Sequence, residues 1–186
     1  MNSTPIQTPR LVLRPILPED ESALFELDSN PEVHRYLGNK PVKAIDEIQE
    51  VIKMIHQQYK ENGIGRWAVI EKESGNFMGW AGLKLVKEPV NNQINYYDLG
   101  YRFIPDYWNK GYATEAALAW VDYAFEQLNL DELIGVADVD NLGSRKVLEK
   151  VGLKHVETFD YHGAEQVWLK ITRQDWEQLK RKAYIH

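Results

Sequence analysis

The chain has no cysteine, no long apolar run and no excess of basic residues. Without cysteine it can form no disulfide, thiolate metal site or cysteine nucleophile. No apolar stretch approaches the roughly 20 residues that span a membrane, and Met1 to Pro5 lack the basic start of a signal peptide. The net charge of −6 argues against a general nucleic-acid-binding protein. We therefore expect a cytoplasmic protein with neither membrane nor nucleic acid as partner.

The length and composition are those of one folded domain. The 186 residues are enough to bury a sizeable core, and 44% of them are hydrophobic while 27% are charged. No repeat, linker or low-complexity tract divides the sequence, so we expect a single domain over residues 1–186. The five histidines include no pair with zinc-protease spacing, and we expect no metal site.

Hydrophobic periodicity predicts alternating strands and helices. Short turns between three central segments, such as Ser74-Gly75-Asn76, predict an antiparallel meander. The fold class is α/β, a mixed sheet with helices on its faces. Strands are expected at Arg10–Ile16, Arg66–Glu71, Phe77–Val86, Ile94–Ile104, Leu133–Val139, Leu153–Phe159 and Gln166–Ile171. Helices are expected near 18–28, 45–62, 111–128 and 141–150, and after the cap Thr172.

The most informative stretch runs from Asp98 to Ala116, where a strand leads through a glycine-containing loop directly into a helix. Amide groups at a helix start are unpaired and carry the positive end of the helix dipole. Gly111 lets the backbone approach a bulky anion, and Lys110 adds a positive charge. The segment is therefore a candidate phosphate cradle. The alternative is that Gly111 only permits a tight turn.

A second stretch runs from Asn141 to Leu153 and opens a helix that Gly152 closes. Asn141 is a good N-cap, and Ser144 lies in the first turn of that helix. Capping alone would account for Asn141, and simple exposure for Ser144. A role in binding or chemistry is the second interpretation of both residues.

Taken together, the two stretches resemble the GNAT superfamily of N-acetyltransferases. The residues that carry the resemblance are Trp108-Asn-Lys-Gly-Tyr-Ala-Thr-Glu-Ala and Asn141-x-x-Ser-x-x-x-Leu-x-x-x-Gly-Leu. Thr8–Arg14, Ser29–Val33 and Asp98–Tyr101 add similarity to the branch of bacterial ribosomal-protein alanine N-acetyltransferases. The resemblance covers nearly the whole chain. It implies a mostly antiparallel sheet of about seven strands flanked by helices.

The resemblance also implies acetyl-coenzyme A as cosubstrate and a set of residues that bind it. Arg102, Phe103 and Ile104 would lie on the strand that pairs with the pantetheine arm, and Asn141 would bind the pantetheine or adenosine part. Arg145 or Lys146 would meet a phosphate. Trp108 stands where many members carry Gln or Arg, which leaves the pyrophosphate to backbone amides and Lys110. Those amides belong to Asn109, Lys110, Gly111, Tyr112, Ala113 and Thr114.

We expect transfer of acetyl to a primary amine, most simply the α-amine of a protein or peptide, by direct attack without a covalent enzyme intermediate. Asp98 is the candidate base and Ser144 the candidate acid for the leaving thiolate, with Asp138 and Glu71 as reserve bases. A backbone N–H near Phe103 would stabilise the oxyanion.

Three alternatives remain open at this level. The acceptor could be a small-molecule amine such as a polyamine, amino acid or aminoglycoside. The chain could be a non-catalytic acyl-coenzyme A-binding module, with Asp98 only a solvated or salt-bridged strand residue. The protein could be a monomer or a homodimer.

Overall fold

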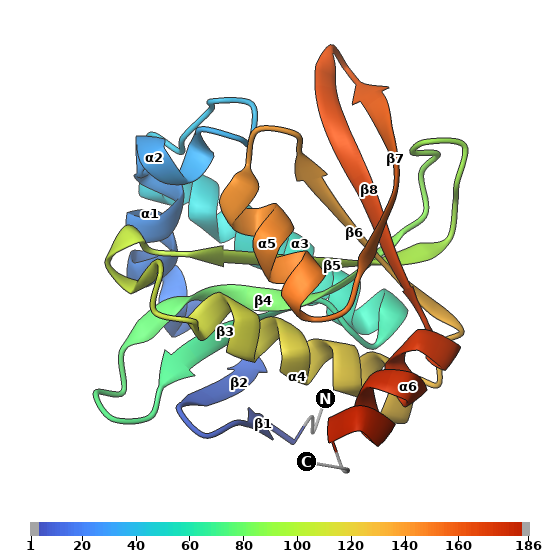
Figure 1. The fold of residues 1–186 in the computed structure, drawn as a ribbon. Coiled ribbons are helices and arrows are strands. Elements are labelled where there is room, and N and C mark those ends of the chain that lie inside the picture. The colour runs from blue at the N-terminus through green and yellow to red at the C-terminus, as the bar shows by residue number, and fades with distance from the viewer. Residues whose placement is uncertain (1–3, 184–186) are drawn as a thin grey trace.

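The computed structural model describes residues 4–183, and these form an eight-stranded sheet with helices on both faces (Figure 1). The sheet order is β1-β2-β3-β4-β5-β6-β8-β7, antiparallel throughout except for the parallel contact between β5 and β6. The strands are β1 (Ile6–Gln7), β2 (Leu11–Pro15), β3 (Arg66–Glu71), β4 (Phe77–Val86), β5 (Tyr96–Phe103), β6 (Glu132–Asp138), β7 (Lys154–Tyr161) and β8 (Ala164–Thr172). The helices are α1 (Glu21–Ser29), α2 (Pro31–His34), α3 (Ile45–Asn62), α4 (Tyr112–Glu126), α5 (Leu142–Lys150) and α6 (Arg173–Ala183).

This order confirms the predicted α/β class and the central meander. The extreme ends of the expected domain, and Met1 to Ser3 of the segment weighed as a signal peptide, lie outside the described residues. Within residues 4–183, no helix is both long and apolar enough to cross a membrane.

Three short elements were absent from the prediction, namely β1, α2 and the 3-10 helix η2 (Pro105–Tyr107). Strand β1 has two residues, too few for any alternating pattern, and it adds an eighth strand at the sheet edge. Helix α2 starts at Pro31, directly after α1, because the Asn30 side chain accepts the Glu32 N–H at 2.9 Å and proline fits the first position of a helix. The Asn-Pro pair therefore ends one helix and begins the next.

The sheet has two faces with different cover. Helices α4 and α5 lie on one face and α1 and α3 on the other (Figure 1). Side chains alternate between the faces along β5: Tyr101 reaches Ser144 on α5, whereas Arg102 reaches Asp28 on α1. The α4 face is apolar, as shown by the buried Trp67 and Trp120 rings, whose centroids are 5.1 Å apart.

Strands β5 and β6 diverge, and this opens a gap in the middle of the sheet. Their only paired residues are Asp98 and Ile134, near the start of both strands. Beyond this point the strands separate toward their carboxyl ends, as Figure 1 shows. The loop before α4 and the start of α5 follow those two ends, so residues of both sequence motifs border the same gap.

Candidate active site

The loop before α4 has the backbone conformation of an anion-binding nest. Asn109 and Gly111 both have positive φ angles, 58° and 81°. The first helical bond is donated by Glu115 N–H to the Gly111 carbonyl at 3.0 Å, so the amides of Tyr112, Ala113 and Thr114 precede it. Unpaired amides at a helix start attract phosphate oxygens. This geometry is what the sequence predicted for the loop, and its role in binding pyrophosphate stays a prediction.

Arg10, from the turn between β1 and β2, is hydrogen-bonded to this loop and to the first turn of α4. Its Nη1 donates to the Lys110 carbonyl at 3.0 Å, and its Nε donates to Glu115 Oε2 at 2.6 Å. Thr8 Oγ1 donates to the other oxygen of the same carboxylate at 2.6 Å. A Cβ at Gly111 would come within 3.4 Å of Arg10 Nη2, so the loop lies close against this guanidinium.

Tyr112 connects Arg10 to Glu71 at the end of β3. Arg10 Cζ lies 4.2 Å from the centroid of the Tyr112 ring, and the Tyr112 hydroxyl donates to Glu71 Oε1 at 2.5 Å. Glu71 also accepts from Ser74 Oγ at 2.7 Å, and these two hydrogen bonds lower the pKa of its carboxyl. Glu71, one of the reserve bases, is thus hydrogen-bonded to the first residue of α4 and to Ser74.

Asp98 stands where β5 and β6 part. Its Oδ1 is buried and has no hydrogen-bond partner among the described residues. Burial raises the pKa of the Asp98 carboxyl to about 6, although a hydrogen bond from the Val136 N–H acts in the opposite direction. A carboxylate that is ionised at neutral pH yet poorly solvated is a competent proton acceptor. The reserve Asp138 differs, because its carboxylate accepts from Asp140 N–H at 2.9 Å.

The edge of β5 that faces the gap carries free main-chain donors. Ile104 N–H donates to the Met78 carbonyl on β4 at 2.9 Å. Because amides alternate in direction along a strand, the N–H groups of Tyr101 and Phe103 point away from β4, toward β6. Strand β6 has already diverged there, so these donors face the gap. The Phe103 carbonyl on this edge accepts from Trp108 Nε1 at 2.7 Å.

Ser144 meets Tyr101 on the α4 face of the gap. The Tyr101 hydroxyl donates to the Ser144 carbonyl at 2.8 Å and lies 3.1 Å from Ser144 Oγ. Burial raises the pKa of the Tyr101 phenol above its ordinary value, so the phenol stays protonated at neutral pH. Asp98 and Tyr101 face opposite sides of β5, which separates the candidate base from the candidate acid pair.

The other predicted residues divide between the gap and the structure around it. Asn141 caps α5 by accepting the Ser144 N–H at 3.1 Å. Arg145 donates to the Val139 carbonyl at 2.8 Å, and Lys146 is exposed. Arg102 contributes backbone to β5, but its side chain pairs with Asp28 on the α1 face, Nη1 to Oδ1, at 2.5 Å. Their part in binding the cosubstrate stays a prediction.

Sequence reasoning missed the contacts of Arg10, Glu115 and Tyr101. Arg10 belongs to the Thr8–Arg14 motif, but no local pattern links it to a helix more than a hundred positions later. Tyr101 and Ser144 are 43 positions apart, and no local pattern links the two side chains.

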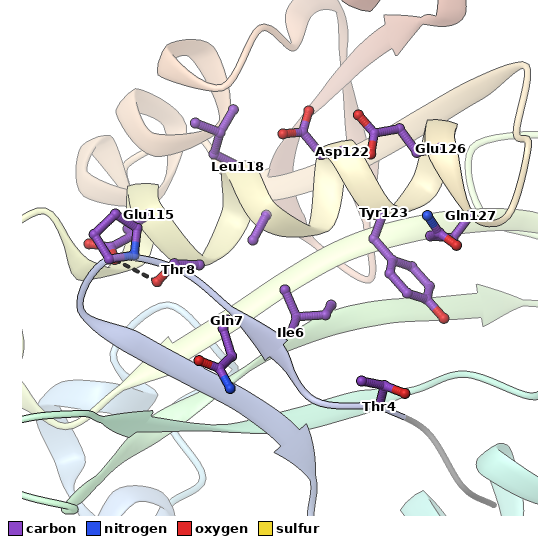
Figure 2. Close-up of a pocket in the computed structure, with 12 residues that line it drawn as sticks. Thr4, Ile6, Gln7, Thr8, Glu115, Leu118, Asp122, Tyr123, Glu126 and Gln127 are labelled. Carbon is purple, nitrogen blue, oxygen red and sulfur yellow. Dashed lines mark hydrogen bonds between the residues drawn. The ribbon is translucent and has the colours of Figure 1, made fainter.

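A groove between β1 and α4 is a poor candidate for the cosubstrate site. It has a volume of about 520 Å³, and Figure 2 shows Glu115, Asp122 and Glu126 on the α4 side of it. The figure also shows the hydrogen bond from Thr8 to Glu115 that crosses its end. Three carboxylates are the wrong lining for a diphosphate. The groove also lies on the β1 side of α4 rather than at the gap between β5 and β6.

Comparison with known proteins identifies the family. The family model of the acetyltransferase (GNAT) domain matches residues 10–154. The FsC-acetyl coenzyme A-N(2)-transacetylase of Aspergillus fumigatus is 32% identical over 95% of this chain and 79% of its own. The spermidine N(1)-acetyltransferase of Escherichia coli is 32% identical over 75% of this chain and 70% of its own.

A solved structure shows the same fold. The GNAT-family acetyltransferase of Bacillus anthracis superposes with a TM-score of 0.76 at 24% identity, over 92% of this chain and 99% of its own. The chain belongs to the GNAT acetyltransferase family, as the sequence motifs predicted. It is an acetyl-coenzyme A-dependent N-acetyltransferase that acts on an amine.

Proposed function

We propose that this protein acetylates an α-amine, that of a protein, a peptide or an amino acid, with Asp98 as general base. The observation that carries this is the Asp98 carboxyl at the apex of the gap, with a pKa of about 6 and a buried oxygen without a partner. The α-ammonium of a protein or peptide titrates near 8 and a lysine ammonium near 10.4. The pKa of the ammonium exceeds that of the Asp98 carboxyl by about 2 for the α-ammonium and by more than about 4 for the lysine ammonium.

The residues around the gap fit acetyl-coenzyme A. The nest at Gly111 offers free amides for a diphosphate, and the free edge of β5 offers donors to an extended amide-containing arm. When bound, the cosubstrate supplies a thioester whose carbonyl carbon accepts the amine and whose thiolate departs.

Each remaining step falls to a residue of the chain. Asp98 takes the proton from the ammonium on the α1 face. The N–H groups of Phe103 and Tyr101 donate to the oxygen on which charge develops. Ser144, hydrogen-bonded to the Tyr101 hydroxyl, gives a proton to the departing thiolate on the α4 face. The second proton that the attacking nitrogen loses as it becomes an amide passes to solvent and restores the Ser144 hydroxyl. Positioning of the two substrates supplies most of the acceleration.

The relatives named above act on different amines, and their names leave the acceptor of this chain open. A polyamine is the second candidate, favoured by the similarity to the spermidine enzyme. A panel of α-amino peptides, free amino acids, Nα-blocked lysine and spermidine, read by product mass and thiol release, separates the candidates. Acetylation of spermidine or the lysine side chain, with no α-amine acetylated, would reject the proposal.

A further inference from the structure

Arg66, at the start of β3, is a partly buried cation without an acceptor. Its guanidinium Cζ lies 4.6 Å from the centroid of the Trp80 ring. No carboxylate or carbonyl of residues 4–183 accepts a hydrogen bond from this guanidinium. A guanidinium carries five donors, and proteins usually pair a buried one with a carboxylate.

Other arginines of similar burial are satisfied. Arg102 pairs with Asp28 at 2.5 Å, and Arg14 pairs with Asp20 at 2.7 Å. Arg145 donates to the Val139 carbonyl and Arg173 to the Phe125 carbonyl. The unpaired donors of Arg66 are therefore a specific feature of this position.

Arg66 and Asp98 border one patch on the α1 face. Arg66 pairs with Gly82 across β3 and β4, and Gly82 pairs with Gly100 across β4 and β5. Asp98 precedes Gly100 by two residues and faces the same side. Gly100 leaves room for the Trp80 ring, since a Cβ at Gly100 would come 3.3 Å from Trp80 Cζ3.

This arrangement is an aromatic floor with a cation at one end and the candidate base at the other. Two strand spacings and two residue rises put the α-carbons of Arg66 and Asp98 about 12 Å apart. The Trp80 ring lies beside both groups, since Arg66 Cζ is 4.6 Å from its centroid and a Cβ at Gly100 would come 3.3 Å from Trp80 Cζ3 and 4.0 Å from Asp98 Oδ2. The charge of Arg102, beside the floor, is already matched by Asp28.

We propose that Arg66 binds a carboxylate of the acceptor, so that the substrate is an α-amine with a carboxylate a few bonds away. This inference rests on the proposed function. The carboxylate belongs either to a free amino acid or to an acidic first residue of a peptide, and both present the same planar partner to the guanidinium fork. A spermidine molecule would instead bring a second cation toward Arg66, which disfavours polyamines at this site.

The test compares acceptors that carry a carboxylate with neutral counterparts, and each rate is referred to the concentration of unprotonated amine. L-Aspartate, L-alanine and L-alaninamide test the free amino acids, Asp-Ala-amide and Asn-Ala-amide test the peptides, and spermidine is the cationic control. We expect one carboxylate-bearing acceptor to exceed its amide partner in kcat/KM by about 10- to 100-fold, the usual effect of a charged hydrogen-bond pair. If the preference occurs among the free amino acids, the carboxylate is that of an amino acid. If it occurs among the peptides, the carboxylate is that of an acidic first residue.

Variants assign the preference to Arg66. Arg66→Gln is expected to abolish the preference while leaving the KM for acetyl-coenzyme A unchanged, and Arg66→Lys to retain part of it. Arg181→Gln, on the exposed side of α6, is the matched control. Equal rates for acid and amide acceptors, or a preference that survives Arg66→Gln, would overturn the inference and leave α-amine acetylation standing. If no α-amine is acetylated, the proposed function itself fails. Even if a variant does not fold, the rates of the unaltered protein with carboxylate and amide acceptors show whether the acceptor's carboxylate is recognised.

Discussion

Arg10 Nη1 donates to the Lys110 carbonyl at 3.0 Å, and this contact joins the turn after β1 to the loop that opens α4. The same guanidinium holds Glu115 in the first turn of the helix, Nε to Oε2, at 2.6 Å. The conformation of the proposed pyrophosphate nest therefore depends on a residue that does not border the gap. Arg10 is a positioning residue in this sense.

Replacing Arg10 with methionine should loosen the loop without touching the reacting atoms. We expect the KM for acetyl-coenzyme A to rise about tenfold while kcat changes less than about threefold, because positioning of the cosubstrate is lost and the chemistry is not. Steady-state kinetics with varied acetyl-coenzyme A measures both constants. Arg35→Met, which removes an exposed arginine stacked on Tyr36, is the control and should change neither. A fall in kcat alone would contradict the positioning role.

Gly111→Ala tests the nest itself. Alanine at a φ of 81° is strained by about 1 kcal/mol, and its Cβ would project toward the Arg10 guanidinium. We expect calorimetry to show at least about tenfold weaker binding of acetyl-coenzyme A. Gly75→Ala is a matched control, since Gly75 has a φ of 73° in a turn with open space around it. Both variants should lose similar thermal stability, and only the first should lose affinity. Unchanged affinity in Gly111→Ala would show that the anion binds elsewhere.

Asp98→Asn should nearly abolish turnover, because asparagine cannot accept the proton. The expected loss in kcat is about 10²- to 10⁴-fold, the usual contribution of a general base. In the unaltered protein, kcat/KM should fall as the pH drops through about 6, where the Asp98 carboxyl becomes protonated. Asp46→Asn, on the exposed side of α3, is the control and should retain full activity. An acid limb near 4, or an active Asp98→Asn variant, would remove Asp98 from this role.

The same carboxyl predicts how stability depends on pH. Its pKa is about 6 in the folded protein and 3.8 when free, so the folded state favours the protonated form. The stability this gives is present below about pH 3.8 and is lost as the pH rises through about 6. Asp98→Asn should therefore raise the Tm at pH 7 to 8 relative to the unaltered protein, and the difference should shrink below pH 4. Thermal melts at several pH values measure it, and a lower Tm at pH 7 would contradict the burial of this charge.

Ser144→Ala and Tyr101→Phe should have small effects on rate. A thiolate with a pKa near 8.5 departs with little help, so we expect each variant to keep kcat within about fivefold. The double variant should resemble the singles, since the two hydroxyls are hydrogen-bonded partners and act as one unit. Single-turnover kinetics isolates the chemical step. A loss above about a hundredfold in either single variant would show that protonation of the thiolate limits the reaction.

The amino-acid sequence by itself determined the longer strands and helices and two local features. Periodicity placed the strands and helices, Gly111 marked the helix start where free amides gather, and Asn141 marked the cap of α5. These features could be predicted because each depends on neighbours within a few residues, where spacing and backbone preference decide the conformation. The position of Asp98 came from its place in a motif, and its environment did not.

Only the tertiary structure decided which distant residues meet. The contacts of Arg10 with Glu115 and of Tyr101 with Ser144 join separate parts of the chain. The patch from Arg66 to Asp98 depends on the register of three strands. A shift of one residue would move every side chain to the other face, and turn geometry and core packing together fix that register. Burial likewise comes from the assembled sheet, which is why the raised pKa of Asp98 could not be inferred from its neighbours in sequence.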